Sequence, residues 1–295
     1  EFFMSFGDIV LGKQTVLCFD TPAFIANRIG VMSGTALVNL TIEYKMSIEE
    51  VDAITGPLIG RPNTATFKLQ DLVGLDTSEK VSSFVIETVK NDDFFEDLKN
   101  KQEPSFMNFL LSNKFYGNKS GKGFYQKTKE KDSNGRSIVN VLNLNTLKYE
   151  KTIRPKLKIV KDAKPIQNIG KRLSFLVSGK EKENLFLKDY FSLLFNYSAQ
   201  MAPEISSSFF QIDDAMRTGY FWDYGPFELW DLIGFETGFQ MIEKSGHTIP
   251  DWVKKMKEDS ITSFYKFESG KKKYFDQESK TYKAVPSADN YIILD

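Results

Sequence analysis

The sequence predicts a mainly α-helical chain with two tandem helical repeats, each followed by a small β-hairpin. Three observations favour this fold class. Apolar residues recur at helical spacing along most of the chain, for example from Phe24 to Tyr44. The frame Phe-x-Leu-x-Asp-Leu-x-Gly occurs twice, at residues 67–74 and 227–234. Each copy is followed by a Phe-Tyr pair and a hairpin-like segment, so the two halves repeat in the same order.

Composition limits the classes of function. The chain has 295 residues, of which 41% are hydrophobic and 26% charged, so it can bury a core in each of two compact units. Lysine plus arginine equal aspartate plus glutamate at 39 each, which gives no global field to attract nucleic acid or an anionic membrane. No apolar run approaches the roughly 18 residues of a membrane span. We expect a cytoplasmic protein with no membrane span and no nucleic-acid partner.

Several motifs that would carry chemistry are missing from the sequence. The single cysteine, Cys18, excludes an internal disulfide and a cysteine-built metal site. The single histidine, His247, lies in a turn-like segment without a second histidine to share a metal, so we expect a surface loop residue. No Gly-x-Gly-x-x-Gly motif follows a strand, which predicts no nucleotide-binding loop in this chain. Residues 1–12 have the pattern of the end of an amphipathic helix, and we expect the chain to be part of a longer protein.

A strand followed by a long helix is expected near the start of the chain. Residues 15–19 are β-branched and apolar, which is the pattern of a buried strand. The helix is expected from Pro22 to Lys45, with Asp20 or Thr21 as its cap. Asn27 lies two positions from the apolar face of this helix. Such an asparagine can simply satisfy a hydrogen bond near the helix start, or it can serve a ligand.

The rest of the first half is expected to be helical and then to form a hairpin. A capping box from Ser47 to Glu50 opens a helix that ends at Ile54. Residues 91–102 are polar and expected to be exposed. The further helices are expected at residues 67–73, 76–90 and 103–111. The hairpin is expected to start at Phe124-Tyr125, with a solvated loop at 127–136, an alternating stretch at 138–149 and a turn at Asn145-Thr146.

A basic connector at residues 151–171 is expected to separate the halves, and the second half is expected to be helical again. Helices are predicted at 183–201 and 203–217. Their aromatic residues recur at helical spacing, which indicates a core rather than a cofactor site. The residues of this stripe are Phe186, Tyr190, Phe191, Leu194, Phe195, Phe209 and Phe210.

The internal duplication extends to the residues before the repeated frame. Asp52 precedes the first frame and Asp213 the second, and the two spacings differ by one residue. The second copy has Gly225-Pro226 before its frame, whereas the first has Ala65-Thr66, so we expect Thr64 or Thr66 to cap the first helix. The aspartates inside the frames, Asp71 and Asp231, are expected to be structural. Two copies in one chain can pack as an internal pseudo-dimer, which predicts a monomer in solution.

Two motifs resemble those of a known enzyme family. The sequence Asp-Thr-Pro-x-Phe-Ile-x-Asn-Arg at residues 20–28 resembles the interdomain joint of the NAD-dependent 3-hydroxyacyl-CoA dehydrogenases. The sequence Gly-Pro-Phe-x-Leu-x-Asp at 225–231 resembles the signature of their C-terminal domain. The family usually has Gly at Ala23, a small-for-small change.

The resemblance implies a fold and a division into domains. It implies two 6-phosphogluconate-dehydrogenase-like C-terminal helical repeats. Residues 1–20 would then be the tail of an NAD-binding domain, 21–160 the first helical domain with its hairpin, and 161–295 the second.

The same resemblance implies a function for the parent protein. Such enzymes oxidise 3-hydroxyacyl-CoA to 3-oxoacyl-CoA in fatty-acid β-oxidation, using a His oriented by a Glu and bound NAD. The His, the Glu and most of the NAD site belong to the domain before this piece, and His247 matches neither motif. By resemblance Asn27 lies beside the reacting carbon of the substrate. This chain would close the acyl-CoA cleft, would be inactive alone, and in larger members shares its polypeptide with an enoyl-CoA hydratase domain.

Two alternatives stay open. A non-catalytic helical scaffold that assembles with partners or binds acyl-CoA would also tolerate the degenerate Ala65-Thr66 of the first copy. A dehydrogenase of the same architecture could act on a small hydroxyacid, although the two motifs together favour the CoA-thioester branch.

Overall fold

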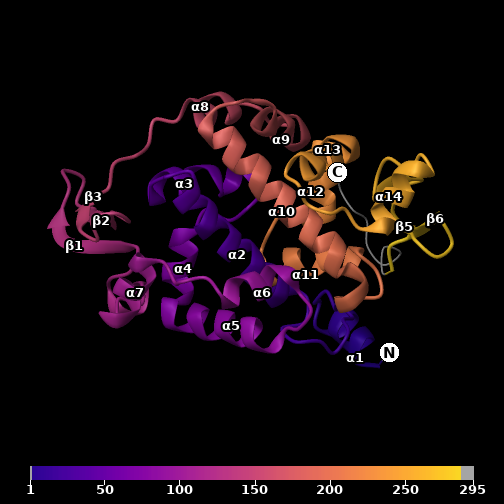
Figure 1. Ribbon diagram of the computed structural model, residues 1–295, viewed down its shortest axis with the longest axis horizontal. Coiled ribbons are helices and arrows are strands. Elements are labelled where there is room, and N and C mark those ends of the chain that lie inside the picture. The colour runs from indigo at the N-terminus through magenta and orange to yellow at the C-terminus, as the bar shows by residue number, and fades with distance from the viewer. Residues whose placement is uncertain (1, 287–295) are drawn as a thin grey trace. The chain divides into compact units, whose positions relative to one another are not determined.

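The computed structural model describes residues 2–286 as two compact units. Glu1, where the first expected domain begins, lies outside the described residues. So do residues 287–295, where the last expected domain ends. Unit 1 consists of residues 1–30, 168–178 and 187–295, and unit 2 of residues 31–167 and 179–186. The long helices α2 (Ala26–Glu43) and α10 (Lys182–Ile205) each contribute residues to both units. The mainly helical class is confirmed (Figure 1).

Unit 2 contains most of α2, a series of shorter helices and one small sheet. The shorter helices are α3 (Ile48–Ile54), α4 (Phe67–Val73), α5 (Leu75–Thr88), α6 (Asp93–Lys99), α7 (Ser105–Ser112) and α8 (Lys158–Ala163). The expected capping box is confirmed, because the Ser47 hydroxyl accepts a bond from the Glu50 N–H and the Glu50 carboxylate accepts one from the Ser47 N–H. Most of the segment 91–102 is exposed, as expected, but not all of it. Asp92 caps α6, and the helix buries the side chain of Phe95 completely.

The sheet of unit 2 has three antiparallel strands in the order β1-β2-β3. They are β1 (Tyr125–Lys131), β2 (Ser137–Leu142) and β3 (Tyr149–Lys151). The loop expected at 127–136 is therefore too long, since β1 uses its first part as a strand paired with β2. The turn at Asn145-Thr146 is confirmed, and the Asn143 side chain accepts hydrogen bonds from both of their N–H groups.

Asp52 ties the start of α4 to the first sheet. Its carboxylate accepts hydrogen bonds from the backbone N–H groups of Thr66, Phe67 and Lys68 at 3.0, 2.7 and 3.3 Å. It also accepts a bond of 2.8 Å from the hydroxyl of Tyr125 in β1. The expected cap by the Thr64 or Thr66 side chain is wrong, because a carboxylate from the preceding helix satisfies the free N–H groups instead.

Asp71 holds the start of β1. Its two carboxylate oxygens accept hydrogen bonds from the N–H groups of Phe124 and Tyr125, at 2.8 and 2.7 Å. Gly123 permits this approach, because a β-carbon there would lie 2.1 Å from the Asp71 Oδ1. The structural role expected for Asp71 is thus confirmed.

Unit 1 is built from helices and a second three-stranded antiparallel sheet, β4-β5-β6. Its helices are α1 (Phe2–Ser5), α9 (Ile169–Ser178), α11 (Phe210–Tyr220), α12 (Pro226–Ile233), α13 (Phe235–Lys244), α14 (Asp251–Glu258) and most of α10. Its strands are β4 (Tyr265–Glu268), β5 (Lys271–Asp276) and β6 (Thr281–Ala284). The connector expected at 151–171 contains the division between the units at 167–168, but α8 and the start of α9 lie within it, and α8 buries apolar residues such as Ile159 and Ala163.

A helix break was expected at Pro203, but α10 continues through it to Ile205. Proline lacks the N–H that would bond to the carbonyl oxygen four residues earlier. That oxygen belongs to Ala199, and it accepts a hydrogen bond of 2.9 Å from the indole N–H of Trp252 instead. The orphaned acceptor is therefore satisfied, and the helix survives the proline.

The expected aromatic core is confirmed. Trp230 is fully buried and stacks on Phe195 and Phe235, with ring centroids 5.2 and 5.9 Å apart. Phe264 packs edge-on against Phe227 at 5.0 Å. Each such pair contributes about 0.5–1.5 kcal/mol beyond the area it buries, so this cluster is a main source of stability in unit 1.

Asp213 and Asp231 make in unit 1 the bonds that Asp52 and Asp71 make in unit 2. Asp213 accepts hydrogen bonds from the N–H groups of Phe227 and Glu228 at the start of α12, at 2.9 and 3.1 Å. It accepts a further bond of 2.6 Å from the Tyr265 hydroxyl. Asp231 accepts bonds from the N–H groups of Phe264 and Tyr265, at 2.8 and 2.7 Å.

Candidate functional site

The start of α2 differs from the expectation. Residues 15–19 form no strand, because no described strand pairs with them. The last of them, Phe19, donates a backbone hydrogen bond to the Ile205 oxygen. The helix begins at Ala26 rather than Pro22. Ala23 and Phe24 have φ angles of 66° and 52°, which place a left-handed turn before the helix. Among the described residues, no side-chain cap from Asp20 or Thr21 is found at this helix start.

The left-handed turn gives Ala23 a conformational cost. An L-residue with a β-carbon pays roughly 1–2 kcal/mol in this region, whereas glycine does not. A glycine at this position would therefore be favoured by the backbone, and the exchange for Ala23 is not neutral. The turn leads into the first residues of α2, of which Asn27 is exposed while Arg28 and Ile29 are buried.

Asn27 is the second residue of α2, and its side chain is exposed. Its Oδ1 accepts a hydrogen bond of 3.4 Å from the hydroxyl of Tyr220, the last residue of α11. Among the residues that the structure describes, the Nδ2 group makes no hydrogen bond. The amide is thus half satisfied, which leaves two N–H donors available to water or to a ligand.

Arg28, the next residue, anchors this turn and is fully buried. Its Nε donates to the Tyr197 hydroxyl at 2.8 Å, and its Nη2 donates to Glu204 Oε1 at 3.1 Å and to Met201 Sδ at 3.3 Å. All three partners lie on α10. A buried guanidinium is stable only with such partners, so these bonds fix the first turn of α2. The sequence analysis did not predict that Arg28 is buried. The only local indication was its position beside the apolar Ile29.

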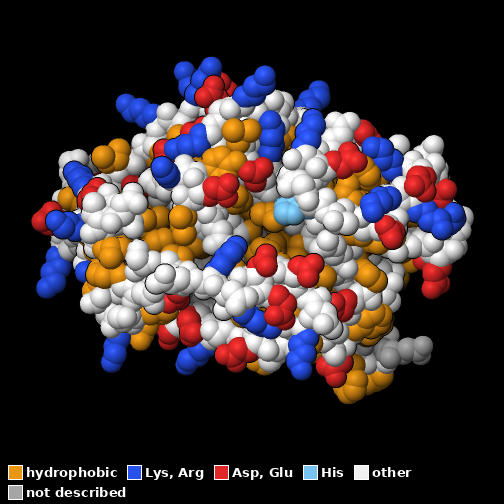
Figure 2. All heavy atoms as spheres, viewed as in Figure 1, with side chains coloured by type: hydrophobic (Ala, Val, Ile, Leu, Met, Phe, Trp, Pro, Cys, Tyr) orange, Lys and Arg blue, Asp and Glu red, His pale blue; other side chains and the backbone are white. Residues whose placement is uncertain are grey.

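A group of large apolar side chains is exposed at the start of unit 1. Figure 2 shows apolar side chains at the surface near the position of α1 (lower right), while acidic and basic side chains are intermingled elsewhere on the face in view. Large exposed apolar surface commonly marks a contact with another domain or protein. The residues of this group, called here the N-terminal apolar surface, are Phe2, Phe3, Met4, Phe6, Ile9, Val10, Leu11, Leu17, Phe19 and Phe24.

The buried aspartates have perturbed acidities but face the backbone. Burial raises the pKa of Asp71 to about 6 and that of Asp231 to about 7, although the N–H bonds they accept oppose this shift. Burial also raises the pKa of Asp52 and of Asp213. All four carboxylates accept bonds that hold helix and hairpin starts, so their raised pKa values reflect architecture rather than an active site.

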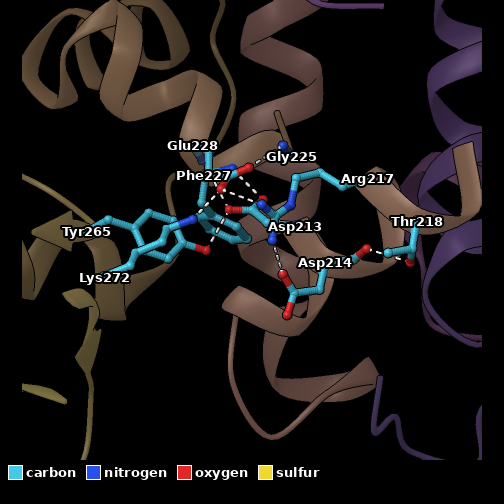
Figure 3. A network of polar contacts seen from close by, with 9 residues as sticks. All are labelled: Asp213, Asp214, Arg217, Thr218, Gly225, Phe227, Glu228, Tyr265 and Lys272. Atoms are coloured by element: carbon cyan, nitrogen blue, oxygen red, sulfur yellow. Dashed lines mark hydrogen bonds and ion pairs between the residues drawn. The ribbon is translucent and has the colours of Figure 1, made fainter. Parts of the chain in front are cut away.

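A cluster of charged side chains surrounds Asp213 in Figure 3. Glu228 accepts a bond of 2.7 Å from the Gly225 N–H, which completes a cap at the start of α12. The same carboxylate pairs with Lys272 of β5 and lies 3.5 Å from Arg217 Nη1. Glu228, Arg217, Asp214 and Lys272 are paired with one another, and Asp213 accepts N–H bonds of α12, so we assign the cluster to the support of α12. The repeat pattern alone did not reveal this cluster.

His247 does not join the candidate site. It lies in the loop after α13, as expected, but it is half-buried rather than fully exposed. Burial lowers its pKa, opposed by the nearby Asp189. Within residues 2–286 no three metal-ligating side chains come together, and no helix there is both long and apolar enough to cross a membrane.

Comparison with known proteins adds an independent line of evidence. Residues 24–127 match the family described as 3-hydroxyacyl-CoA dehydrogenase, C-terminal domain. A probable 3-hydroxyacyl-CoA dehydrogenase of Bacillus subtilis is 36% identical over 285 residues, which are 97% of this chain and 34% of the relative. A putative fatty acid oxidation complex trifunctional enzyme of Rickettsia prowazekii is 30% identical over 288 residues, 95% of this chain and 37% of the relative. The chain therefore spans about a third of the length of these relatives.

A solved structure supports the fold. The crystal structure of 3-hydroxybutyryl-CoA dehydrogenase from Escherichia coli aligns with a TM-score of 0.54, covering 83% of this chain and 61% of that chain. The sequence identity is 18%, so this likeness concerns the fold alone.

Proposed function

The chain belongs to the 3-hydroxyacyl-CoA dehydrogenase family, and we propose that it is the helical part of an NAD-dependent enzyme of fatty-acid β-oxidation. That enzyme would oxidise 3-hydroxyacyl-CoA to 3-oxoacyl-CoA. The observation that carries the proposal is Asn27, an exposed amide with two available N–H donors on a helix turn that buried Arg28 holds in place.

The role proposed for Asn27 is electrostatic. Its Nδ2 group would donate a hydrogen bond to the oxygen on the reacting carbon of the acyl-CoA. A donor fixed before the reaction stabilises charge that develops on that oxygen. We assign no proton transfer to this chain, because its single histidine, His247, lies in another loop and is not part of the motif around Asn27.

The residues of this chain do not fit NAD. Both described sheets are antiparallel, and no described strand leads through a glycine-rich turn into a helix, as a dinucleotide site requires. NAD would therefore be bound mainly by a separate nucleotide-binding domain. The N-terminal apolar surface supports such a neighbour, since it is suited to pack against another folded domain. This chain would close the acyl-CoA cleft against that domain, and on its own it would be inactive.

Further partners follow from the relatives. By the family resemblance, an enoyl-CoA hydratase domain would share the polypeptide, and the relative described as a putative fatty acid oxidation complex trifunctional enzyme of Rickettsia prowazekii supports a protein with several activities. We propose a cytoplasmic location, which the single cysteine fits.

We also propose that the chain contains two tandem helical domains, at 21–160 and 161–295, after a tail of the NAD-binding domain at 1–20. The support is that Asp52 and Asp71 in the first part accept bonds from the starts of a helix and a hairpin, and Asp213 and Asp231 accept the corresponding bonds in the second. Two such domains in one chain can bury their helical faces against each other, so the chain should be a monomer. Sedimentation equilibrium should give 33.8 kDa, and a mass near twice that value would contradict it.

The test of Asn27 uses the full-length product of the gene. NADH oxidation with acetoacetyl-CoA should be fast in the full-length protein and absent from the 295-residue piece. Asn27→Ala should lower turnover by about a hundredfold or more, because loss of one preorganised donor commonly costs about 2.7–4 kcal/mol of barrier. The thermal midpoint should stay within a few degrees.

Asn39→Ala, on the same helix, is the matched control and should leave turnover unchanged. An unchanged rate in Asn27→Ala would remove this residue from the site. Inactivity of the full-length protein would instead favour a non-catalytic scaffold.

A further inference from the structure

Tyr220 is placed against the first two turns of α2 by a glycine. A β-carbon at Gly30 would lie 2.2 Å from both the Cζ and the hydroxyl oxygen of Tyr220. The ring therefore rests directly on the backbone of α2, in space that any other residue would fill. Gly30 is three residues after Asn27, so it lies on the same side of the helix, one turn further along.

The backbone at the end of α11 also lies close to the start of α2. A β-carbon at Gly219 would lie 3.3 Å from the β-carbon of Ala26, so this close approach is also made at a glycine. The Tyr220 ring packs edge-on against Trp222, which is buried. Tyr220 is thus held on two sides, and its hydroxyl is directed to a single described partner, Asn27 Oδ1.

A bond to Oδ1 determines what the rest of the amide can do. The carboxamide of an asparagine can turn by half a rotation, which exchanges its acceptor oxygen with its two donors. A hydroxyl that donates to Oδ1 favours the orientation in which Nδ2 points away from Tyr220. Burial raises the pKa of Tyr220, so the hydroxyl keeps its proton and remains a donor at neutral pH.

We propose that Tyr220 is a positioning residue for the reaction, holding the Asn27 carboxamide by its oxygen so that Nδ2 is presented to the substrate oxygen. This inference rests on the function proposed above, because it concerns the same amide. It assigns the second helical half a part in the chemistry, through one hydroxyl that does not touch the substrate.

The experiment is a double-mutant cycle in the full-length protein, assayed by NADH oxidation with acetoacetyl-CoA. Tyr220→Phe keeps the ring on Gly30 and removes only the hydroxyl. It should lower kcat by about three- to tenfold, the usual worth of one hydrogen bond, with KM changed less than about twofold. Tyr224→Phe is the matched control: no described hydrogen bond uses its hydroxyl, and kcat should not change. Thermal midpoints of all variants check the fold.

The decisive readout is the effect of Tyr220→Phe when Asn27 is already replaced. If Tyr220 acts through Asn27, the double variant should be no slower than Asn27→Ala alone. A kcat loss that persists in the Asn27→Ala background, or an unchanged kcat in Tyr220→Phe, would overturn the positioning role and leave the proposed function standing. An unchanged rate in Asn27→Ala would overturn the roles of both Asn27 and Tyr220, and inactivity of the full-length protein would overturn the proposed function itself.

Discussion

Asp52 in unit 2 and Asp213 in unit 1 do the same work in different surroundings. Each caps a short helix and accepts a bond from a tyrosine of the following sheet. Asp213 is fully buried and is enclosed by the Glu228 and Lys272 pair. At the position of Glu228 unit 2 has Lys68, whose side chain is half exposed and 3.8 Å from the Asp52 carboxylate.

The loops that lead into α12 in unit 1 and into α4 in unit 2 also differ. In unit 1 a β-carbon at Gly225 would lie 2.2 Å from the Asp213 Cα, so the approach requires glycine. In unit 2 the corresponding residue is Ala65, which takes a φ of 50°, and the loop from Asp52 has one residue more. The extra residue and the left-handed turn make room for the alanine. Both regions therefore share the hydrogen bonds to the carboxylate. The loop before the capped helix differs between them.

The largest test of the comparison removes the two capping aspartates in turn. Asp213→Ala should lower the free energy of unfolding by about 3–5 kcal/mol, since it leaves two buried N–H groups and the buried Tyr265 hydroxyl without their acceptor. Asp52→Ala should lower the free energy of unfolding by about 2–3 kcal/mol. The loss is smaller because the neighbouring Lys68 side chain is half exposed, so water can reach the groups that lose their acceptor. Urea unfolding followed by far-UV circular dichroism reports the helices of both units, while tryptophan fluorescence reports unit 1, which holds Trp222, Trp230 and Trp252. Equal losses in the two variants would contradict the difference in surroundings.

A second test exchanges the residues before the helices. Gly225→Ala should destabilise by about 1–3 kcal/mol, because the added carbon must push the Asp213 backbone away. Ala65→Gly should be neutral or stabilise by up to about 1 kcal/mol, since it relieves a left-handed alanine. The midpoint of urea unfolding measures both. If Gly225→Ala were tolerated, the tight approach at Asp213 would not be needed.

The smallest expected effect is a pH dependence of the free energy of unfolding. It should differ between Asp71 and Asp231, the aspartates inside the two repeated frames. The pKa values of Asp71 and Asp231 are raised by burial, from 3.8 to about 6 and about 7. Their contribution to stability is fully present below pH 3.8 and is lost as the pH rises through about 6 for Asp71 and about 7 for Asp231. From about pH 6 to 7.5 the loss should be about 1 kcal/mol from Asp231 and less than half of that from Asp71.

Urea unfolding at several pH values, with Asp231→Asn and Asp71→Asn as paired variants, checks this difference. Asp231→Asn should flatten the pH dependence more than Asp71→Asn does. A dependence that survives both substitutions would assign it to other groups.

Local sequence patterns predicted most helices because their signals are contained within a few residues. The Ser47 to Glu50 capping box and the two Phe-x-Leu-x-Asp frames are of this kind. The errors arose where a distant residue decides the outcome. Pro203 should end α10 by local rules, but the Trp252 indole N–H, far along the chain, satisfies the freed carbonyl. The strand expected at 15–19 needs a partner strand, which no local pattern can supply.

The candidate site shows the same division. Asn27 could be singled out by its motif, since the motif is continuous in sequence. Tyr220 and the α10 residues that hold Arg28 could not, because they lie between 169 and 193 positions later in the chain. Position 188, which lies as far beyond Asn27 as Asp213 lies beyond Asp52, is a lysine. The repeat therefore gave no hint that the second half contributes to the first.

Arg28 makes the two halves hard to separate in evolution. A gene that lost the second half would keep Asn27 but would lose Tyr197, Met201 and Glu204, which now surround the guanidinium. The first turn of α2 would have to fray to bring that charge back to water, and Asn27 would fray with it. Selection on Asn27 would then also act on α10, which supplies the partners of Arg28.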